Sequence, residues 1–92
     1  MSTLVVGGGL SGLVHAYELS KMGEEVRVLE KGNLPGGAVR TIEKDGYLLE
    51  LGPNTVRPSA KLLELCRELA IDQEVLLSDP KLPRFVDRGG RL

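Results

Sequence analysis

Glycines near the amino end of the chain are spaced in a way that suits phosphate binding. They lie in the run Gly7-Gly8-Gly9-Leu10-Ser11-Gly12. Gly7 permits a tight turn, Gly9 has no Cβ and so lets the backbone approach a diphosphate, and Gly12 allows a helix to pack closely on a sheet. The diphosphate would then lie on the free N–H groups and the positive dipole end of that helix.

An acidic residue follows the glycines, at the end of a second apolar run. Glu30 comes directly after Val26-Arg27-Val28-Leu29, and its carboxylate can accept hydrogen bonds from both hydroxyls of an adenosine ribose. A carboxylate there repels a 2′-phosphate, which disfavours NADP, although Arg27 and Lys31 soften that argument. NAD and FAD share an ADP half, so these residues leave both open. The simpler alternative is a generic turn in which Glu30 is only a solvated strand-end charge.

The flanking sequence predicts the strands and the helix that carry the glycines and Glu30. Apolar runs predict strands at 3–6 and 25–30, and helical spacing predicts a helix at 10–22 that ends at Gly23. Strand, glycine turn, helix, strand and acid follow one another as in a dinucleotide-binding βαβ unit. The predicted fold class is therefore α/β, the amino-terminal part of a Rossmann-like domain with parallel strands.

The rest of the chain predicts a loop, a hairpin and a second helix. Gly36-Gly37 would either line a cofactor or merely turn the chain, and Asp45-Gly46 favours a hairpin over 40–51. Ser59 is a suitable N-cap for a helix over 60–70. Beyond that helix, the pattern predicts a connector with a short strand at 71–77 and a hairpin in which 84–87 and 91–92 flank 88–90.

Composition narrows the class of protein. The 92 residues carry a net charge of −1 without a basic stripe, so nucleic-acid binding has little support. We find no signal peptide and no apolar run near the roughly 20 residues of a membrane-spanning helix.

The sequence offers no serine–histidine pair, paired carboxylates or metal cluster, so it predicts no catalytic side chain and no metal. A parallel sheet needs further strands and helices to cover it, so residues 1–92 are expected to be the amino-terminal segment of a larger enzyme.

Several downstream segments resemble the protoporphyrinogen oxidase family, within the flavin amine oxidase superfamily. The glycine motif, Gly36-Gly37 and Thr41 are shared widely among such flavoproteins. The resemblance covers the whole chain, and its narrower part consists of Asp45-Gly46-Tyr47, Glu50 to Thr55, Arg57-Pro58-Ser59, Asp79 to Val86 and Gly89 to Leu92.

The resemblance implies FAD as the cofactor and gives several residues a role. Asn54 would face the substrate near the flavin, and Arg84 would pair with a propionate of a porphyrinogen, since a guanidinium matches a carboxylate bidentately. An ordinary surface charge is the alternative for Arg84. The implied cofactor contacts are Gly7, Gly8, Gly9, Leu10, Ser11 and Gly12 for the pyrophosphate, Glu30 and Lys31 for the ribose, Gly36, Gly37 and Ala38 for the diphosphate and ribityl chain, and Gly52, Pro53, Asn54 and Thr55 for the isoalloxazine ring.

The activity implied by the resemblance is that of an FAD-dependent, oxygen-dependent oxidoreductase of heme and chlorophyll biosynthesis. It would oxidise protoporphyrinogen IX, or coproporphyrinogen III, to the porphyrin in three two-electron steps, passing hydride to the flavin and electrons to O₂. The enzyme would be cytoplasmic or peripheral on an inner or organellar membrane. The family's usual phosphate-binding arginine is replaced by Leu34, for which Lys31 or Arg40 would compensate. The alternatives are an amine oxidase, a carotenoid desaturase, or a truncated chain that binds nucleotide without catalysis.

Overall fold

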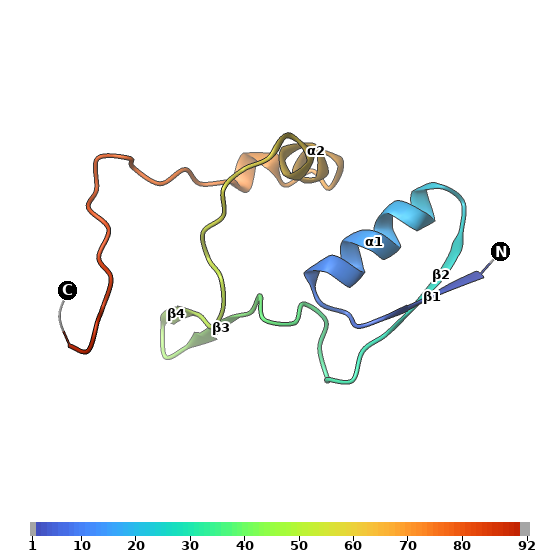
Figure 1. Ribbon diagram of the computed structural model, residues 1–92, viewed down its shortest axis with the longest axis horizontal. Coiled ribbons are helices and arrows are strands. Elements are labelled where there is room, and N and C mark those ends of the chain that lie inside the picture. The colour runs from blue at the N-terminus through green and yellow to red at the C-terminus, as the bar shows by residue number, and fades with distance from the viewer. Residues whose placement is uncertain (1, 91–92) are drawn as a thin grey trace. The chain divides into compact units, whose positions relative to one another are not determined.

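The computed structural model describes residues 2–90, and the chain divides into two compact units, Met1–Val56 and Arg57–Leu92. The first unit contains two pairs of strands and a helix, and the second contains a helix and a short 3₁₀-helix (Figure 1). In chain order the elements are β1 (Ser2–Val6), α1 (Leu10–Lys21), β2 (Glu25–Leu29), β3 (Thr41–Lys44), β4 (Tyr47–Glu50), α2 (Ala60–Glu68) and η1 (Asp72–Glu74).

The amino-terminal βαβ unit has the predicted order and direction. Strand β1 runs parallel to β2, with Ser2 opposite Glu25 and Val6 opposite Leu29. Helix α1 crosses between them and lies over one face of the pair (Figure 1). Side chains alternate along both strands, so that Val5 and Val28 are half-buried while their neighbours are exposed. The predicted α/β class with parallel strands is confirmed.

Helix α1 ends where the sequence predicts. The N–H of Gly23 donates to the carbonyl of Ser20 at 3.1 Å, and Gly23 has a φ of +85°, the left-handed conformation that glycine adopts without strain. The apolar residues of α1 are only partly covered, because Val14 and Tyr17 are half-buried whereas Leu10, Leu13 and Met22 are exposed. A sheet of two strands is too narrow to cover the whole stripe.

The predicted hairpin forms around Asp45-Gly46. Strands β3 and β4 pair antiparallel, from Thr41 opposite Glu50 to Lys44 opposite Tyr47. Asp45 and Gly46 have φ values of 53° and 80°, and positive φ at both central residues is the mark of a type I′ turn. Such a turn twists in the same sense as the strands, which explains why this dipeptide fixes the hairpin.

The second unit confirms one helix and corrects two predicted strands. Ser59 caps α2, since its Oγ accepts a hydrogen bond from the N–H of Leu62 at 3.1 Å. The predicted strand at 71–77 is wrong: its centre is η1, and 75–77 is irregular. Residues 84–87 are also irregular, and 91–92 lie outside the described residues. A strand needs a hydrogen-bonded neighbour, and the described part of this unit supplies none to either segment.

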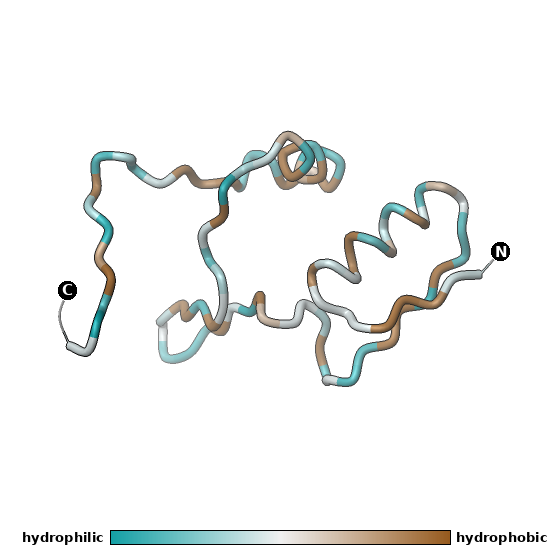
Figure 2. The backbone as a smooth tube through the Cα atoms, in the orientation of Figure 1, coloured by the Kyte–Doolittle hydropathy of each residue, from teal (hydrophilic) through white to brown (hydrophobic). Residues whose placement is uncertain are grey.

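Apolar side chains remain largely uncovered. Gly8 is the only buried residue between 2 and 90. Leu4, Val6 and Leu29 lie on the face of β1 and β2 that points away from α1, and all three are exposed (Figure 2 shows the apolar strands). Parallel sheets are normally covered on both faces. The open face is what an incomplete Rossmann-like domain would present.

Candidate nucleotide-binding site

The glycine run forms the turn between β1 and α1. Gly7 has a φ of +103°, which a residue with a side chain rarely adopts. Its N–H donates to the carbonyl of Leu29 at 2.7 Å, so the parallel pairing of β1 and β2 continues to the start of the turn. The turn therefore begins at the carboxyl ends of both strands, where α/β sheets bind their ligands.

The amino end of α1 presents free hydrogen-bond donors. Its N-cap is Gly9, which has extended backbone angles and offers no side-chain oxygen, and the first turn contains no acidic residue. The first intrahelical bond runs from the N–H of Leu13 to the carbonyl of Gly9 at 3.0 Å. The N–H groups of 10–12 have no intrahelical acceptor, and together with the helix dipole they favour an anion.

Gly12 and Gly9 differ in the space that surrounds them. A Cβ built on Gly12 would overlap the carbonyl oxygen of Gly7 and lie 3.5 Å from Cγ1 of Val5, so α1 packs directly on the turn and on β1. A Cβ on Gly9 would meet nothing within 4 Å. The space over Gly9 is therefore open to a ligand, as a close approach by a diphosphate requires.

Glu30 joins two loops through one carboxylate. Its Oε1 accepts the N–H of Gly8 at 2.9 Å, and its Oε2 accepts the N–H of Gly32 at 2.6 Å. Gly8 is buried, whereas Glu30 is exposed and remains accessible to a ligand. The carboxylate thus fixes the glycine turn to the segment that leaves β2.

These hydrogen bonds keep Glu30 ionised. The N–H of Gly32 lowers the pKa of the Glu30 carboxyl most, the N–H of Gly8 lowers it further, and the charge of Lys31 adds to both, while desolvation opposes them. An ionised carboxylate is the form that accepts hydrogen bonds from a ribose and repels a 2′-phosphate.

The loop after β2 returns to the glycine turn. The N–H of Gly36 donates to the carbonyl of Gly8 at 2.8 Å, and Gly36 forms a parallel bridge with Gly9. A Cβ built on Gly37 would lie 3.1 Å from the Cα of Gly9. The structure therefore brings together the glycine run and Glu30, which the sequence assigns to the ADP half of a dinucleotide, and Gly36-Gly37, which the resemblance places along the diphosphate and ribityl chain.

The remaining candidate residues of the first unit take no part in the hydrogen bonds described above for the glycine turn and Glu30. Most of them are exposed, and Ala38 makes a backbone contact elsewhere. Lys31 is exposed beside Glu30, and Leu34 is 59% exposed. Ala38 contacts Gly52 through its carbonyl group. Pro53, Asn54 and Thr55 form an exposed irregular segment in which the Thr55 hydroxyl donates to Oδ1 of Asn54 at 3.2 Å. Their contact with a flavin ring stays a prediction.

Arg84 belongs to the second unit. It is exposed and lines a pocket together with Ser78, Asp79, Pro80, Leu82 and Pro83. The Asp79 carboxylate is engaged in this loop, where its Oδ1 accepts the N–H of Lys81 at 2.9 Å. The predicted role of Arg84 towards a propionate stays a prediction.

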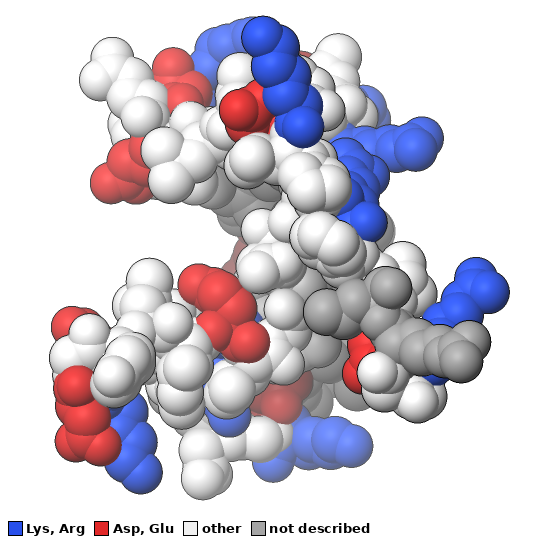
Figure 3. All heavy atoms as spheres, turned by 90° about the vertical axis from the view of Figure 1, so that its left-hand side faces the viewer, with Lys and Arg blue, Asp and Glu red and all other residues white. Residues whose placement is uncertain are grey.

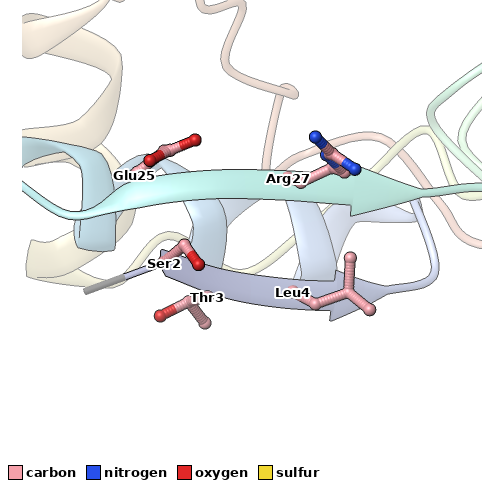
Figure 4. Close-up of a pocket in the computed structure, with 5 residues that line it drawn as sticks. All are labelled: Ser2, Thr3, Leu4, Glu25 and Arg27. Carbon is pink, nitrogen blue, oxygen red and sulfur yellow. The ribbon is translucent and has the colours of Figure 1, made fainter.

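Other surface features lie away from the nucleotide groups. Ser2, Thr3, Leu4, Glu25 and Arg27 line a pocket on β1 and β2, where Glu25 and Arg27 project from the same side of β2 (Figure 4). It lies towards the amino ends of the strands, opposite to the glycine turn.

Acidic and basic side chains are interspersed with uncharged ones on the face drawn in Figure 3. Residues 2–90 contain no metal-binding group of three or more His, Cys, Asp or Glu, and no helix long and apolar enough to cross a membrane.

Besides the bonds of Gly8 to Glu30 and Gly36, two further contacts of the site were not predicted from the sequence. The first is the bond between Glu30 and the N–H of Gly32, for which the only signal is that a glycine stands two residues after the acid. The second is the backbone contact between Ala38 and Gly52. Each contact involves a main-chain group of a glycine, which leaves no side-chain pattern in the sequence.

A parallel strand pair, a crossover helix that begins at a glycine turn, and an acid at the end of the second strand define a dinucleotide-binding βαβ unit. In agreement, residues 5–69 match the model of the NAD(P)-binding Rossmann-like domain, and the chain belongs to that family.

Individual relatives are similar to this chain over most or all of its length. The chain is 37% identical over 92 residues to the chloroplastic protoporphyrinogen oxidase of Nicotiana tabacum, covering 100% of this chain and 17% of that protein. It is 39% identical over 102 residues to the protoporphyrinogen oxidase of Bos taurus, covering 99% of this chain and 21% of the relative. It is 40% identical over 76 residues to the coproporphyrinogen III oxidase of Propionibacterium freudenreichii, covering 79% and 14%. The expected resemblance is confirmed, and the chain spans about a sixth of the length of its plant relatives.

Proposed function

We propose that this chain binds the ADP half of FAD and forms the amino-terminal segment, residues 1–92, of a larger flavin-dependent oxidoreductase. One observation carries the proposal: the uncapped end of α1, the Glu30 carboxylate and Gly36 meet at the carboxyl ends of β1 and β2. The helix end suits a diphosphate, and the carboxylate suits a ribose. These two groups would therefore anchor the two parts of one ADP moiety.

The choice of FAD over a nicotinamide cofactor rests on two supports. The ionised Glu30 disfavours the 2′-phosphate of NADP, whereas the ADP half of FAD carries none. The similarity to protoporphyrinogen and coproporphyrinogen III oxidases favours FAD over NAD, because the resemblance to that family implies a flavin. When bound, FAD would supply the hydride acceptance, and this chain would hold its adenosine and diphosphate.

We assign the chain's residues to parts of the cofactor on this basis. The N–H groups at the start of α1, within Gly7 to Gly12, would bind the pyrophosphate, and Glu30, with Lys31 beside it, would bind the ribose. Gly36, Gly37 and Ala38 would line the diphosphate and ribityl chain, and Gly52 to Thr55 would approach the ring. Leu34 contributes no charge to the phosphates, so the diphosphate depends on main-chain donors, with Lys31 or Arg40 as the available cations.

The substrate we propose is a porphyrinogen, with O₂ as electron acceptor. The relatives include enzymes named for protoporphyrinogen and for coproporphyrinogen III, and the site described above favours neither. Arg84 would pair with a propionate, and Asn54 would face the substrate beside the flavin. The enzyme that contains this segment would work in the cytoplasm or peripherally on an inner or organellar membrane, and the chloroplastic relatives agree with the second location.

Nucleotide titration tests the proposal. FAD and ADP should raise the melting temperature of the chain in proportion to log concentration, and adenosine 2′,5′-bisphosphate should not. Gly9→Ala should abolish the shift, because its methyl group would occupy the space that the diphosphate needs. Gly89→Ala, in the second unit, adds the same methyl group where a Cβ meets nothing within 4 Å; it is the control and should keep the shift. A shift with NADP⁺ but not FAD, or no shift with any of these ligands, would contradict the proposal.

A further inference from the structure

We infer that Gly52 is a positioning residue for the nucleotide site: it packs against Ala38 and so sets the position of the segment 36–38, which is bound to the glycine turn. The expected effect of Gly52 on nucleotide binding rests on the proposed function, since the site that Gly52 supports is the one proposed for the ADP half. The structural part concerns only backbone groups of the first unit.

The contact between Gly52 and Ala38 leaves no room for a side chain. A Cβ built on Gly52 would overlap the carbonyl oxygen of Ala38, and it would lie 2.7 Å from the carbonyl carbon and 3.5 Å from the nitrogen of Val39. All three are main-chain atoms, which cannot rotate aside as the end of a long side chain can. Any residue larger than glycine at position 52 must therefore displace the Ala38 carbonyl.

Gly52 is held in this place by the hairpin. The N–H of Leu51 donates to the carbonyl of Arg40 at 2.8 Å, one pair beyond the Thr41–Glu50 pair of β3 and β4. The hydroxyl of Thr41 also donates to Oε2 of Glu50 at 2.7 Å. The segment that enters the hairpin and the segment that leaves it thus run side by side, and Gly52 faces Ala38 where they part.

The segment 36–38 is also bound to the glycine turn. The N–H of Gly36 donates to the carbonyl of Gly8 at 2.8 Å, and the N–H of Val39 donates to the carbonyl of Gly36 at 3.1 Å. The second bond closes a short turn that contains Ala38. A displaced Ala38 carbonyl therefore moves the same turn that pairs with Gly8 and bridges Gly9.

Solvent exposure independently singles out the same two positions. Between Lys31 and Ala60, every residue is exposed except Gly36 and Gly52, which are half-buried. The atoms nearest to a Cβ built on either glycine are main-chain atoms, those of Val39 at Gly36 and those of Ala38 and Val39 at Gly52. The segment is packed by main chain at these two points, one towards the glycine turn and one towards the hairpin. Gly52 consequently acts on the site through Ala38, and its role does not require contact with a ligand.

Amide exchange in the ligand-free, ¹⁵N-labelled full chain tests the inference with Gly52→Ala. The Gly36 N–H should exchange at least about tenfold faster than in wild type. Overpacking at Ala38 would open the hydrogen bond from the Gly36 N–H to the Gly8 carbonyl. The Gly8 and Gly9 amide resonances should shift, while the Gly7 N–H, which bonds to Leu29, should keep its protection. Gly89→Ala is the control, because it adds the same methyl group in the second unit, where a Cβ meets nothing within 4 Å, and it should leave Gly36 unchanged.

Unchanged exchange at Gly36 in Gly52→Ala would overturn the inference. Equal loss of protection at Gly7 and Gly36 would overturn it as well, because Gly52 would then stabilise the whole chain and not this segment. ADP titration gives the functional readout, and Gly52→Ala should weaken ADP binding about tenfold if the segment shapes the site. If wild-type chain binds no ADP, the proposed function fails, and the exchange result still decides the role of Gly52.

Discussion

The carboxylate of Glu30 accepts a hydrogen bond from the backbone N–H of Gly8, with 2.9 Å between oxygen and nitrogen and 22 positions between the residues. This bond ties the acid at the end of β2 to the buried centre of the glycine turn. The second carboxylate oxygen binds the N–H of Gly32. The group proposed to receive the ribose is therefore also the group that sets the turn proposed to receive the diphosphate.

The first prediction concerns the pH dependence of stability. Because folding lowers the pKa of Glu30 below its ordinary 4.5, the carboxylate stabilises the folded chain above that pH. The contribution should decline as the pH falls from about 4.5 through the lowered pKa. In Glu30→Gln this contribution is absent, and one of the two N–H donors faces an amide NH₂.

Denaturant titrations of wild type and Glu30→Gln across this range measure the difference in the free energy of unfolding. Wild type should be the more stable at neutral pH, and the two should converge as the pH falls. The other carboxyl groups titrate in both proteins, so the difference isolates Glu30. A constant difference across the range would show that the carboxylate charge does not stabilise the turn.

The second prediction concerns the packing of α1 on the glycine turn. Gly12→Ala places a Cβ onto the carbonyl of Gly7, so the helix must move away from β1. Overpacking of this kind costs about 1–3 kcal/mol of unfolding free energy. Ser11→Ala, in the same helical turn and exposed, is the control and should change stability by less than about 0.5 kcal/mol. Equal denaturation midpoints for Gly12→Ala and wild type would contradict the prediction.

The features that could be predicted from the sequence are those fixed by local chemistry. Asp45-Gly46 gives the type I′ turn because both residues tolerate positive φ. Ser59 caps α2 because its hydroxyl reaches an N–H three residues on. Gly7 to Gly12 and Glu30 give the βαβ unit because their spacing matches a strand, a turn, a helix and a second strand.

The features that could not be predicted depend on partners distant in the sequence. The contact of Gly52 with Ala38 joins two backbone groups, and glycine leaves no hydrophobic pattern to indicate it. The segment 71–77 contains the apolar residues Ile71, Val75, Leu76 and Leu77, yet 72–74 form η1 and 75–77 are irregular, because a strand also needs a hydrogen-bonded neighbour. The coverage of apolar faces likewise depends on how many strands a sheet has.

The third prediction concerns the cap of α2. Ser59→Ala removes the acceptor of the Leu62 N–H, which should cost about 1 kcal/mol of helix stability. The Leu62 amide should exchange faster, and the helical signal at 222 nm should weaken. Ser78→Ala, in the irregular segment beyond η1, is the control and should change neither. Unchanged exchange at Leu62 in Ser59→Ala would mean that the hydroxyl does not cap the helix.

The fourth prediction concerns Arg84 and rests on the proposed porphyrinogen substrate. In the oxidase that contains this segment, Arg84→Ala should raise the KM for the porphyrinogen about tenfold or more, since a charge-assisted hydrogen bond contributes about 1.5–3 kcal/mol. The kcat should change little, because a propionate lies away from the reacting carbons and binds equally in the ground and transition states. Arg84→Lys keeps the charge but loses the bidentate geometry, so its KM should lie between that of wild type and that of Arg84→Ala. Arg88→Ala, also exposed in this stretch, is the control and should leave KM unchanged. A KM for Arg84→Ala equal to that of wild type would remove Arg84 from the substrate site.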